Sequence, residues 1–174
     1  NDEIESQIDA NLKISADCGN VESQFKYGSI LLNGPTETAQ EGARYIKFAA
    51  DGGYLQAQKL YAYLVRNGII VQQNIKLGDH YMRLAADSGD LTSQIEYATI
   101  LEKTASDISQ TSINSNSSSS SSSSLNSSSN SSVAQVLKMA AKYYFLAAQQ
   151  NDRNAQFIYG TFLEEGKGVQ SDLD

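Results

Sequence analysis

A short segment recurs along this chain, and its spacing limits the folds that the chain can adopt. The fullest copy is residues 86–98, which read ADSGDLTSQIEYA, and near-copies begin at Ala16, Ala50 and Ala148. The glutamines of the four copies are separated by 34, 36 and 62 residues, at Gln24, Gln58, Gln94 and Gln156. The first two intervals match the length of helix-turn-helix repeats such as the tetratricopeptide class, so the sequence predicts a repeat array.

Each repeat unit is predicted to contain two amphipathic helices, named helix A and helix B in chain order. In residues 57–65 the apolar side chains recur three and four positions apart, which is the helical period. A second segment is marked by a small residue followed three positions later by a tyrosine, at Gly42, Gly78 and Ala140. The predicted fold class is therefore all-α, an α/α superhelical solenoid of antiparallel helix pairs that opens in a helix B and closes just after a helix A.

Helix boundaries are also readable from the repeat. Three helix A segments follow a side chain that accepts a hydrogen bond from a first-turn amide, namely Asn20, Asp90 and Asp152. Tyr54 breaks this pattern in the second copy. The preceding turns are predicted to have positive φ, at Gly19, Gly53, Gly89 and Asn151.

Small residues and tyrosines indicate where helices touch. Helix A carries a tyrosine followed by a small residue in every copy, at Tyr27-Gly28, Tyr61-Ala62, Tyr97-Ala98 and Tyr159-Gly160. A small residue permits close backbone approach and the neighbouring ring fills the space beside it. We expect most of the tyrosines to lie in the core.

The third unit contains an insertion. Residues 104–132 are mostly Ser, Asn and Thr, a composition that buries too little apolar surface to offset chain entropy. Lys103 aligns with Asn67 and Val133 with Val71, so the insertion lies between helix A and helix B of one repeat and keeps the register on either side. We expect a disordered loop over 104–132, between repeats in 1–103 and a continuation of the array in 133–174. Both a tract without a role and a modified regulatory loop remain open for it.

Composition narrows the classes of partner. The chain has thirteen Lys and Arg and twenty Asp and Glu, so its net charge is −7. This charge disfavours binding to nucleic acid and to anionic membrane surfaces. No segment approaches the roughly 20 apolar residues of a membrane span. The single cysteine, Cys18, excludes an internal disulfide. The expected localisation is cytoplasmic by default, with a secretory or endoplasmic reticulum location left open, because the sequence lacks an initiator methionine and we expect its N-terminus to be missing.

Catalytic chemistry is not predicted from these residues. Asp79 and the sole histidine, His80, are adjacent, so on a helix they point about 100° apart and are badly placed as an acid–base pair. The recurring carboxylates, Asp17, Asp51 and Asp87, lie a repeat width apart and are interpreted as structural. No phosphate loop, nucleophile elbow or metal-ligand spacing occurs. We therefore expect no enzyme activity, no catalytic residue, no metal and no cofactor.

The remaining candidates for function lie on the exposed face of helix A, where residues differ from copy to copy. A stacked array offers such a face to a protein or peptide partner. The candidate partner-binding residues are Lys26, Ser29, Leu60, Tyr63, Glu96, Thr99, Ile158 and Thr161. The alternative, that these side chains pack between repeats, stays open.

These motifs resemble Sel1-like repeats. The fullest match combines Ala155-Gln156-Phe157, Tyr159-Gly160 and the loop Gly166-Lys167-Gly168-Val169, and residues 71–89 match a complete helix B half. Pro35 at the loop valine position and Ile70 at the second loop glycine depart from the pattern.

The resemblance implies a role as an adaptor or scaffold, as in signalling, chitin synthase activation and membrane-protein degradation complexes. Its alternative is a regulatory or targeting segment of a larger enzyme, such as a protein kinase, whose catalytic domain lies outside these residues. An enzyme within the array is disfavoured, since the relatives credited with activity are cysteine-rich.

Overall fold

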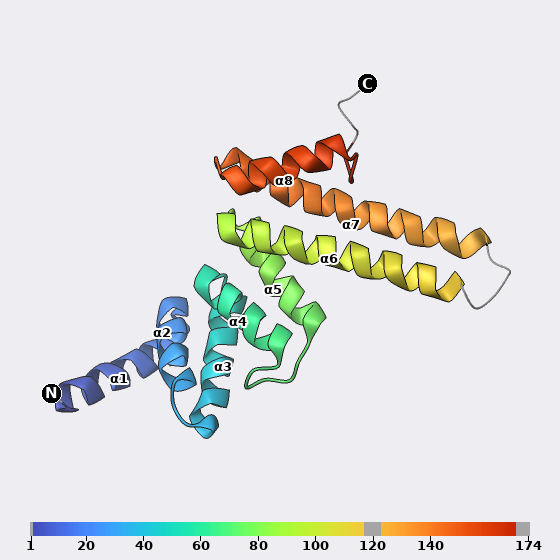
Figure 1. Ribbon diagram of the computed structural model, residues 1–174. Coiled ribbons are helices and arrows are strands. Elements are labelled where there is room, and N and C mark those ends of the chain that lie inside the picture. The colour runs from blue at the N-terminus through green and yellow to red at the C-terminus, as the bar shows by residue number, and fades with distance from the viewer. Residues whose placement is uncertain (1, 117–122, 170–174) are drawn as a thin grey trace. The chain divides into compact units, whose positions relative to one another are not determined.

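The described part of the chain is helical and contains no strand (Figure 1). This computed structural model describes the backbone of residues 2–116 and 123–169 and the side chains of 10–111 and 131–169. The helices are α1 (Asp2–Asp17), α2 (Val21–Leu32), α3 (Thr36–Asp51), α4 (Leu55–Asn67), α5 (Ile75–Asp87), α6 (Leu91–Asn116), α7 (Ser123–Gln149) and α8 (Arg153–Glu164). They alternate as helix B and helix A, starting with α1 as a helix B, so the predicted all-α class is confirmed. Residues 1–88 and 89–174 form two compact units.

Helix A begins where the sequence predicts. The side chains of Asn20 and Asp152 accept hydrogen bonds from the amides of Ser23 and Ala155 at 2.8 and 2.7 Å, and Asp90 accepts from Ser93 at 2.9 Å. Tyr54 makes no side-chain cap. These bonds satisfy amides that a helix start leaves without an intrahelical partner.

The turns before helix A have the predicted left-handed backbone. The φ angles are +90°, +85° and +94° at Gly19, Gly53 and Gly89, and Asn151 adopts +65°. A side chain with a Cβ is disfavoured in this region, and asparagine tolerates it better than most residues. The loop after helix A repeats this geometry at Ile70, whose φ of +67° nearly equals the +69° of Gly168. The departure at Ile70 therefore keeps the loop shape.

The recurring glutamine connects the start of helix A to the end of the preceding helix B by a hydrogen bond. Gln24, Gln58 and Gln156 each donate from Nε2 to the carbonyl eight residues earlier, at 3.1, 3.3 and 3.2 Å. The acceptors are the carbonyls of Ala16, Ala50 and Ala148. Because the last carbonyls of a helix have no partner within it, the glutamine satisfies one of them and fixes the turn.

Aromatic rings join each helix A to the next helix B. Edge-to-face pairs form between Tyr27 and Tyr45, Tyr61 and Tyr81, and Tyr97 and Tyr143, with ring centroids 5.0, 4.9 and 5.0 Å apart. Six of the ten tyrosines are buried, namely Tyr45, Tyr61, Tyr81, Tyr97, Tyr143 and Tyr144. The expectation that most tyrosines belong to the core is confirmed.

The backbones of α2 and α3 approach each other closely. A Cβ added at Gly42 would lie 2.7 Å from the carbonyl oxygen of Gly28 and 2.8 Å from the amide nitrogen of Leu32. The expected close approach is confirmed there, and at Gly78, where a Cβ would lie 3.0 Å from the carbonyl oxygen of Ala62.

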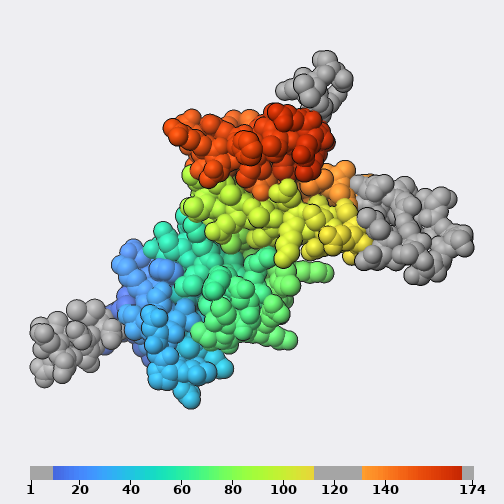
Figure 2. Space-filling model, viewed as in Figure 1, coloured from blue at the N-terminus to red at the C-terminus, as the bar shows by residue number. Residues whose placement is uncertain are grey.

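Gly160 differs from this expectation. A Cβ at Gly160 would meet nothing within 4 Å, because no described helix packs against that side of α8. Figure 2 shows α8, in red, with much of its length at the surface.

The insertion is more helical than its composition predicts. The structure continues α6 to Asn116 and begins α7 at Ser123, so most of the loop expected over 104–132 is helix; residues 117–122 lie outside the described residues. Buried Leu101 and Ala105 extend the apolar face of α6, and the Ser109 hydroxyl donates to the carbonyl of Ala105 at 2.9 Å. Continued packing of α6 against α7 thus outweighs the weak helix propensity of serine and threonine.

Replacing Tyr61 by alanine is expected to destabilise the protein by about 3 to 5 kcal/mol, because the ring is 7% exposed and pairs with Tyr81. Tyr63, on the same helix and 57% exposed, is the matched control, and its alanine variant should stay within about 0.5 kcal/mol of the parent. Urea unfolding of both variants measures this difference. Equal losses in the two variants would contradict the assigned packing.

A second pair of variants tests backbone approach. Gly42→Ala should destabilise by about 1 to 3 kcal/mol, because the new methyl group overlaps the backbone of α2. Gly160→Ala should instead leave stability unchanged or raise it by up to about 1 kcal/mol, since it adds helix propensity in open space. Thermal unfolding followed by circular dichroism distinguishes the two, and a stabilising Gly42→Ala would refute the close contact.

Candidate functional site

Within residues 1–88, the predicted partner-binding residues lie on α2 and α4. Lys26 is exposed and forms an ion pair with Glu22 at 2.7 Å, which raises the pKa of Lys26. The Ser29 hydroxyl is used within α2, where it donates to the carbonyl of Phe25 at 2.7 Å. On α4, Leu60 is half-buried and Tyr63 is exposed.

Within residues 89–174, the other four lie on α6 and α8. Glu96 and Thr99 are exposed on α6, whereas Ile158 and Thr161 are half-buried on α8. The Thr99 hydroxyl donates to the carbonyl of Ile95 at 2.9 Å and lies 3.2 Å from the hydroxyl of Tyr144 on α7. Thr99 and Thr161 therefore have structural contacts, since Thr161 also donates to the carbonyl of Ile158 at 2.7 Å.

The structure also contains an apolar groove that the sequence analysis missed. It has a volume of about 760 Å³ and lies between α7 and α8, with the loop at Gly168 and Val169 at its edge. Met139 and Phe145 are 40% and 41% exposed there, and the Phe145 ring lies 5.2 Å from that of Tyr159. A sequence signal existed at Phe145, because the same repeat position holds Lys13, Lys47 and Arg83 in the other copies.

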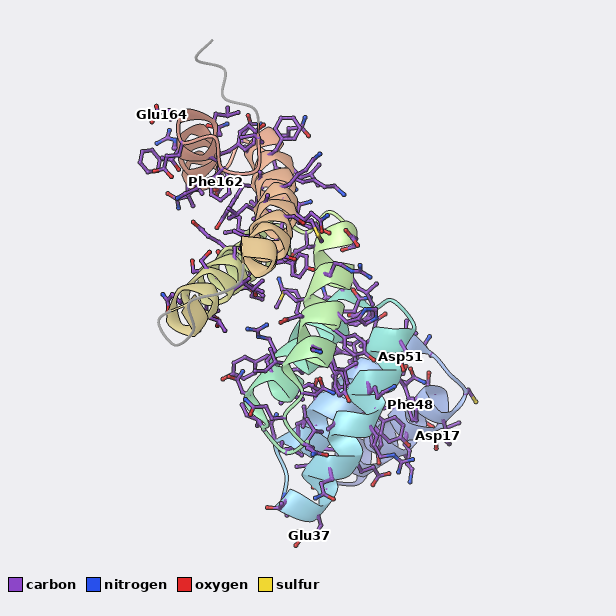
Figure 3. The ribbon with its side chains drawn as sticks, turned by 90° about the vertical axis from the view of Figure 1, so that its right-hand side faces the viewer. Asp17, Glu37, Phe48, Asp51, Phe162 and Glu164 are labelled. Atoms are coloured by element: carbon purple, nitrogen blue, oxygen red, sulfur yellow. The ribbon has the colours of Figure 1, made fainter. Side chains whose placement is uncertain are left out.

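The recurring aspartates bind tyrosine hydroxyls. Tyr45 donates to a carboxylate oxygen of Asp17, and Tyr81 to one of Asp51, each at 2.5 Å. Figure 3 shows Asp17, Phe48 and Asp51 on the same side of the first unit. The structural interpretation is confirmed for these two carboxylates, which join one helix B to the next.

These contacts perturb ionisation. The hydrogen bond to Asp17, with burial, raises the pKa of Tyr45 to about 12, and burial with the bond to Asp51 raises that of Tyr81. Burial pushes the pKa of Asp51 upward, but hydrogen bonds from Lys47 and Tyr81 outweigh it and hold the value below the ordinary range. Tyr81 therefore stays protonated and Asp51 stays ionised, as their hydrogen bond requires.

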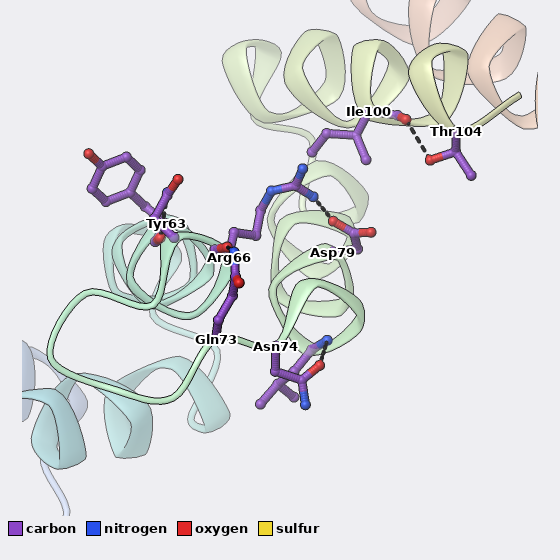
Figure 4. A network of polar contacts seen from close by, with 9 residues as sticks. Tyr63, Arg66, Gln73, Asn74, Asp79, Ile100 and Thr104 are labelled. Atoms are coloured by element: carbon purple, nitrogen blue, oxygen red, sulfur yellow. Dashed lines mark hydrogen bonds and ion pairs between the residues drawn. The ribbon is translucent and has the colours of Figure 1, made fainter. Parts of the chain in front are cut away.

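Asp79 and His80 do not form an acid–base pair. Asp79 forms an ion pair with Arg66, which links α5 to α4 (Figure 4). His80 is exposed, with its ring 5.6 Å from that of Tyr81. In the described ranges no group of three or more His, Cys, Asp or Glu residues is arranged to hold a metal ion. No helix within those ranges is long and apolar enough to cross a membrane.

Comparison with known proteins identifies the repeat. The family model described as Sel1 repeat matches residues 21–54, 55–90, 129–152 and 153–174. The first two matches begin at the first residues of α2 and α4, and each contains one helix A and the following helix B.

Two solved structures have a similar fold. A Sel1 repeat protein from Oxalobacter formigenes aligns with a TM-score of 0.63 and 19% identity over 94% of this chain. The c5321 protein, a protective antigen present in uropathogenic Escherichia coli strains that displays an SLR fold, aligns with a TM-score of 0.61 and 24% identity over 94%. The chain spans 58% and 30% of the lengths of these two proteins. The predicted solenoid fold is thereby confirmed, while no curated protein sequence matches.

An alkaline titration tests the tyrosine–aspartate contacts. Because the pKa of Tyr45 is about 12 in the folded protein and about 10 in an unfolded chain, the folded state holds a proton that the unfolded state has lost between these values. The stability that the Tyr45–Asp17 contact contributes is therefore fully present below about pH 10 and is lost as the pH rises toward 12. Urea unfolding at a series of alkaline pH values measures the decline.

Tyr45→Phe should lose about 1.5 kcal/mol at neutral pH, because a hydrogen bond to a charged group is removed, and should show a shallower alkaline decline. Tyr63→Phe is the control, since that ring is exposed. If Tyr45→Phe loses stability at alkaline pH as steeply as the parent, the Tyr45–Asp17 contact is not the cause of that loss.

Proposed function

Because the chain belongs to the Sel1 repeat family, we propose that it is a non-enzymatic scaffold or adaptor that binds a protein or peptide partner. The proposal places the partner on the exposed face of helix A. It does not assign a cofactor or a catalytic residue.

The distribution of structural contacts supports this proposal. The glutamine, tyrosine and aspartate that recur in each repeat are used to join helices. Positions that change between copies are thus the ones available to recognise a partner.

The exposed ring of Tyr63 is the main support for this proposal. Its ring is 57% exposed, and half-buried Leu60 lies one turn earlier on α4. Tyrosine contributes large contact area at low entropic cost and is enriched among residues that dominate binding energy. An exposed tyrosine in a chain that buries six others is well suited to contact a partner.

Affinity capture with the whole protein, followed by identification of the co-purifying proteins, tests the proposal. Tyr63→Ala, and the charge reversals Lys26→Glu and Glu96→Lys, are expected to reduce capture of a specific partner about tenfold or more when combined. Each changes an exposed side chain, so folding should be retained.

Arg83→Glu with His80→Ala provides a matched control, because both side chains are exposed on a helix B. Capture should be unchanged in this control. Equal capture by the helix A variant and the parent would refute this binding face.

A further inference from the structure

We propose that a polar pocket formed by α1, α2 and α3 binds an arginine side chain of a protein partner. The pocket has a volume of about 290 Å³, which is near the lower limit for ligand sites and suits a single side chain. This inference rests on the proposed function only in that the ligand belongs to a protein. None of the candidate residues on the helix A face lines the pocket.

A buried acceptor without a donor lines the pocket. The Gln24 side chain is 9% exposed, and its Nε2 donates to the carbonyl of Ala16 at 3.1 Å. Its Oε1 accepts no hydrogen bond from any residue that the structure describes. Because a buried acceptor without a partner costs free energy, a ligand that donates to Gln24 is favoured.

The third copy of the repeat shows which group suits this acceptor. There Gln94, at the repeat position of Gln24, accepts a hydrogen bond on Oε1 from Nε2 of Gln150 at 2.9 Å. In the first copy Gly52 stands at the position of Gln150 and has no side chain to supply the donor. A ligand N–H group can therefore take the place that the Gln150 amide has in the third copy.

Two carboxylates make the lining a site for a cation. Asp17 accepts the Tyr45 hydroxyl on Oδ1 at 2.5 Å, and its Oδ2 has no partner among the described residues. Glu41 is half-buried and forms no ion pair within the same part of the chain. The position of Glu41 holds Leu77 and Met139 in the other copies, so this acid is peculiar to one copy. Oxygen acceptors from α1, α2 and α3 thus line one pocket.

An exposed aromatic ring completes the lining. Phe48 is 46% exposed, and its ring stands edge-to-face to that of Tyr45 with centroids 6.3 Å apart. The other copies have Leu84 and Leu146 at this position. Because the face of an aromatic ring attracts a cation, Phe48 and the carboxylates favour the same kind of ligand.

Arginine fits this lining better than lysine does. Its planar guanidinium carries five N–H donors, so it can donate to a carboxylate and to the Gln24 oxygen while its face stacks on Phe48. The ammonium group of lysine is compact and strongly hydrated, and it has no plane to stack. The net charge of −7 also favours the approach of a basic partner.

A capped peptide, acetyl-Gly-Gly-Arg-Gly-Gly-amide, tests the proposal because the guanidinium is its only charge. Binding to the whole 174-residue chain, labelled with nitrogen-15, is followed by two-dimensional NMR. We expect saturable shifts of the Gln24 side-chain amide signal. Replacing the arginine by citrulline keeps the shape but removes the charge, and should weaken binding about tenfold or more. Replacement by lysine should weaken it about threefold or more.

Protein variants with a matched control locate the site. Glu41→Gln and Phe48→Ala should each weaken binding about threefold or more, and neither side chain is fully buried. Glu37→Gln makes the same charge change at an exposed position near the start of α3, away from Phe48 (Figure 3), and should bind normally. Circular dichroism melting checks that the variants remain folded.

Arg44 gives the test a sign. It is exposed and also lines the pocket, where its charge opposes a cation. Arg44→Gln should therefore tighten binding of the arginine peptide about twofold or more.

The proposal is overturned if millimolar peptide gives no saturable shift, or if the citrulline or lysine peptide binds as tightly as the arginine peptide. It is also overturned if Arg44→Gln weakens binding, or if Glu37→Gln weakens it as much as Glu41→Gln does. Partner capture by the Tyr63→Ala protein reports on the helix A face alone, so the two proposals can fail separately.

Discussion

The edge-to-face contact between a helix A tyrosine and the tyrosine of the following helix B is the interaction on which the packing of this chain depends. It occurs three times with nearly the same centroid separation, from 4.9 to 5.0 Å, and an interplanar angle between 84° and 87°. Such geometry places the positive edge of one ring on the negative face of the other. The ring of helix A therefore determines where helix B lies, and the small residue beside it determines how near the backbones come.

Polar side chains complete this arrangement, because the recurring residues hydrogen-bond to one another and to the backbone. The aspartate receives the hydroxyl of the tyrosine that packing has brought to it, and the glutamine closes the turn before helix A. Each of these carboxylates thus has a structural role, since its hydrogen bond joins one helix B to the next. Side chains such as Tyr63 and Phe145, which differ between copies, are exposed instead.

Much of the fold could be predicted because its determinants are local. Helix starts at Asn20, Asp90 and Asp152 depend on one side chain and an amide three residues away, and the positive φ at Gly53 depends on a missing Cβ. The helical content of residues 104–116 could not be predicted from composition, because it follows from packing of α6 against α7. The groove was missed for a similar reason.

Phe145 was visible as an exception in the repeat, yet its exposure depends on the absence of a described helix over α8. Among the proposed partner-binding residues, the sequence could mark variable positions but could not show that Thr99 has a partner in Tyr144. Variation between copies identifies positions whose side chains do not take part in the packing shared by all repeats. It does not distinguish exposed side chains from those with contacts peculiar to one repeat.

The constancy of the tyrosine pairs has a consequence for how such a chain can change length. The paired rings are 18, 20 and 46 residues apart in sequence, yet the longest separation gives the same ring geometry. Most of the added residues extend α6 at its end and α7 at its start, so they lie beyond the tyrosine pair and leave its geometry unchanged. Insertions between the two helices of a repeat are therefore nearly neutral for the fold. Natural selection can lengthen and rework that connection while the array keeps its register.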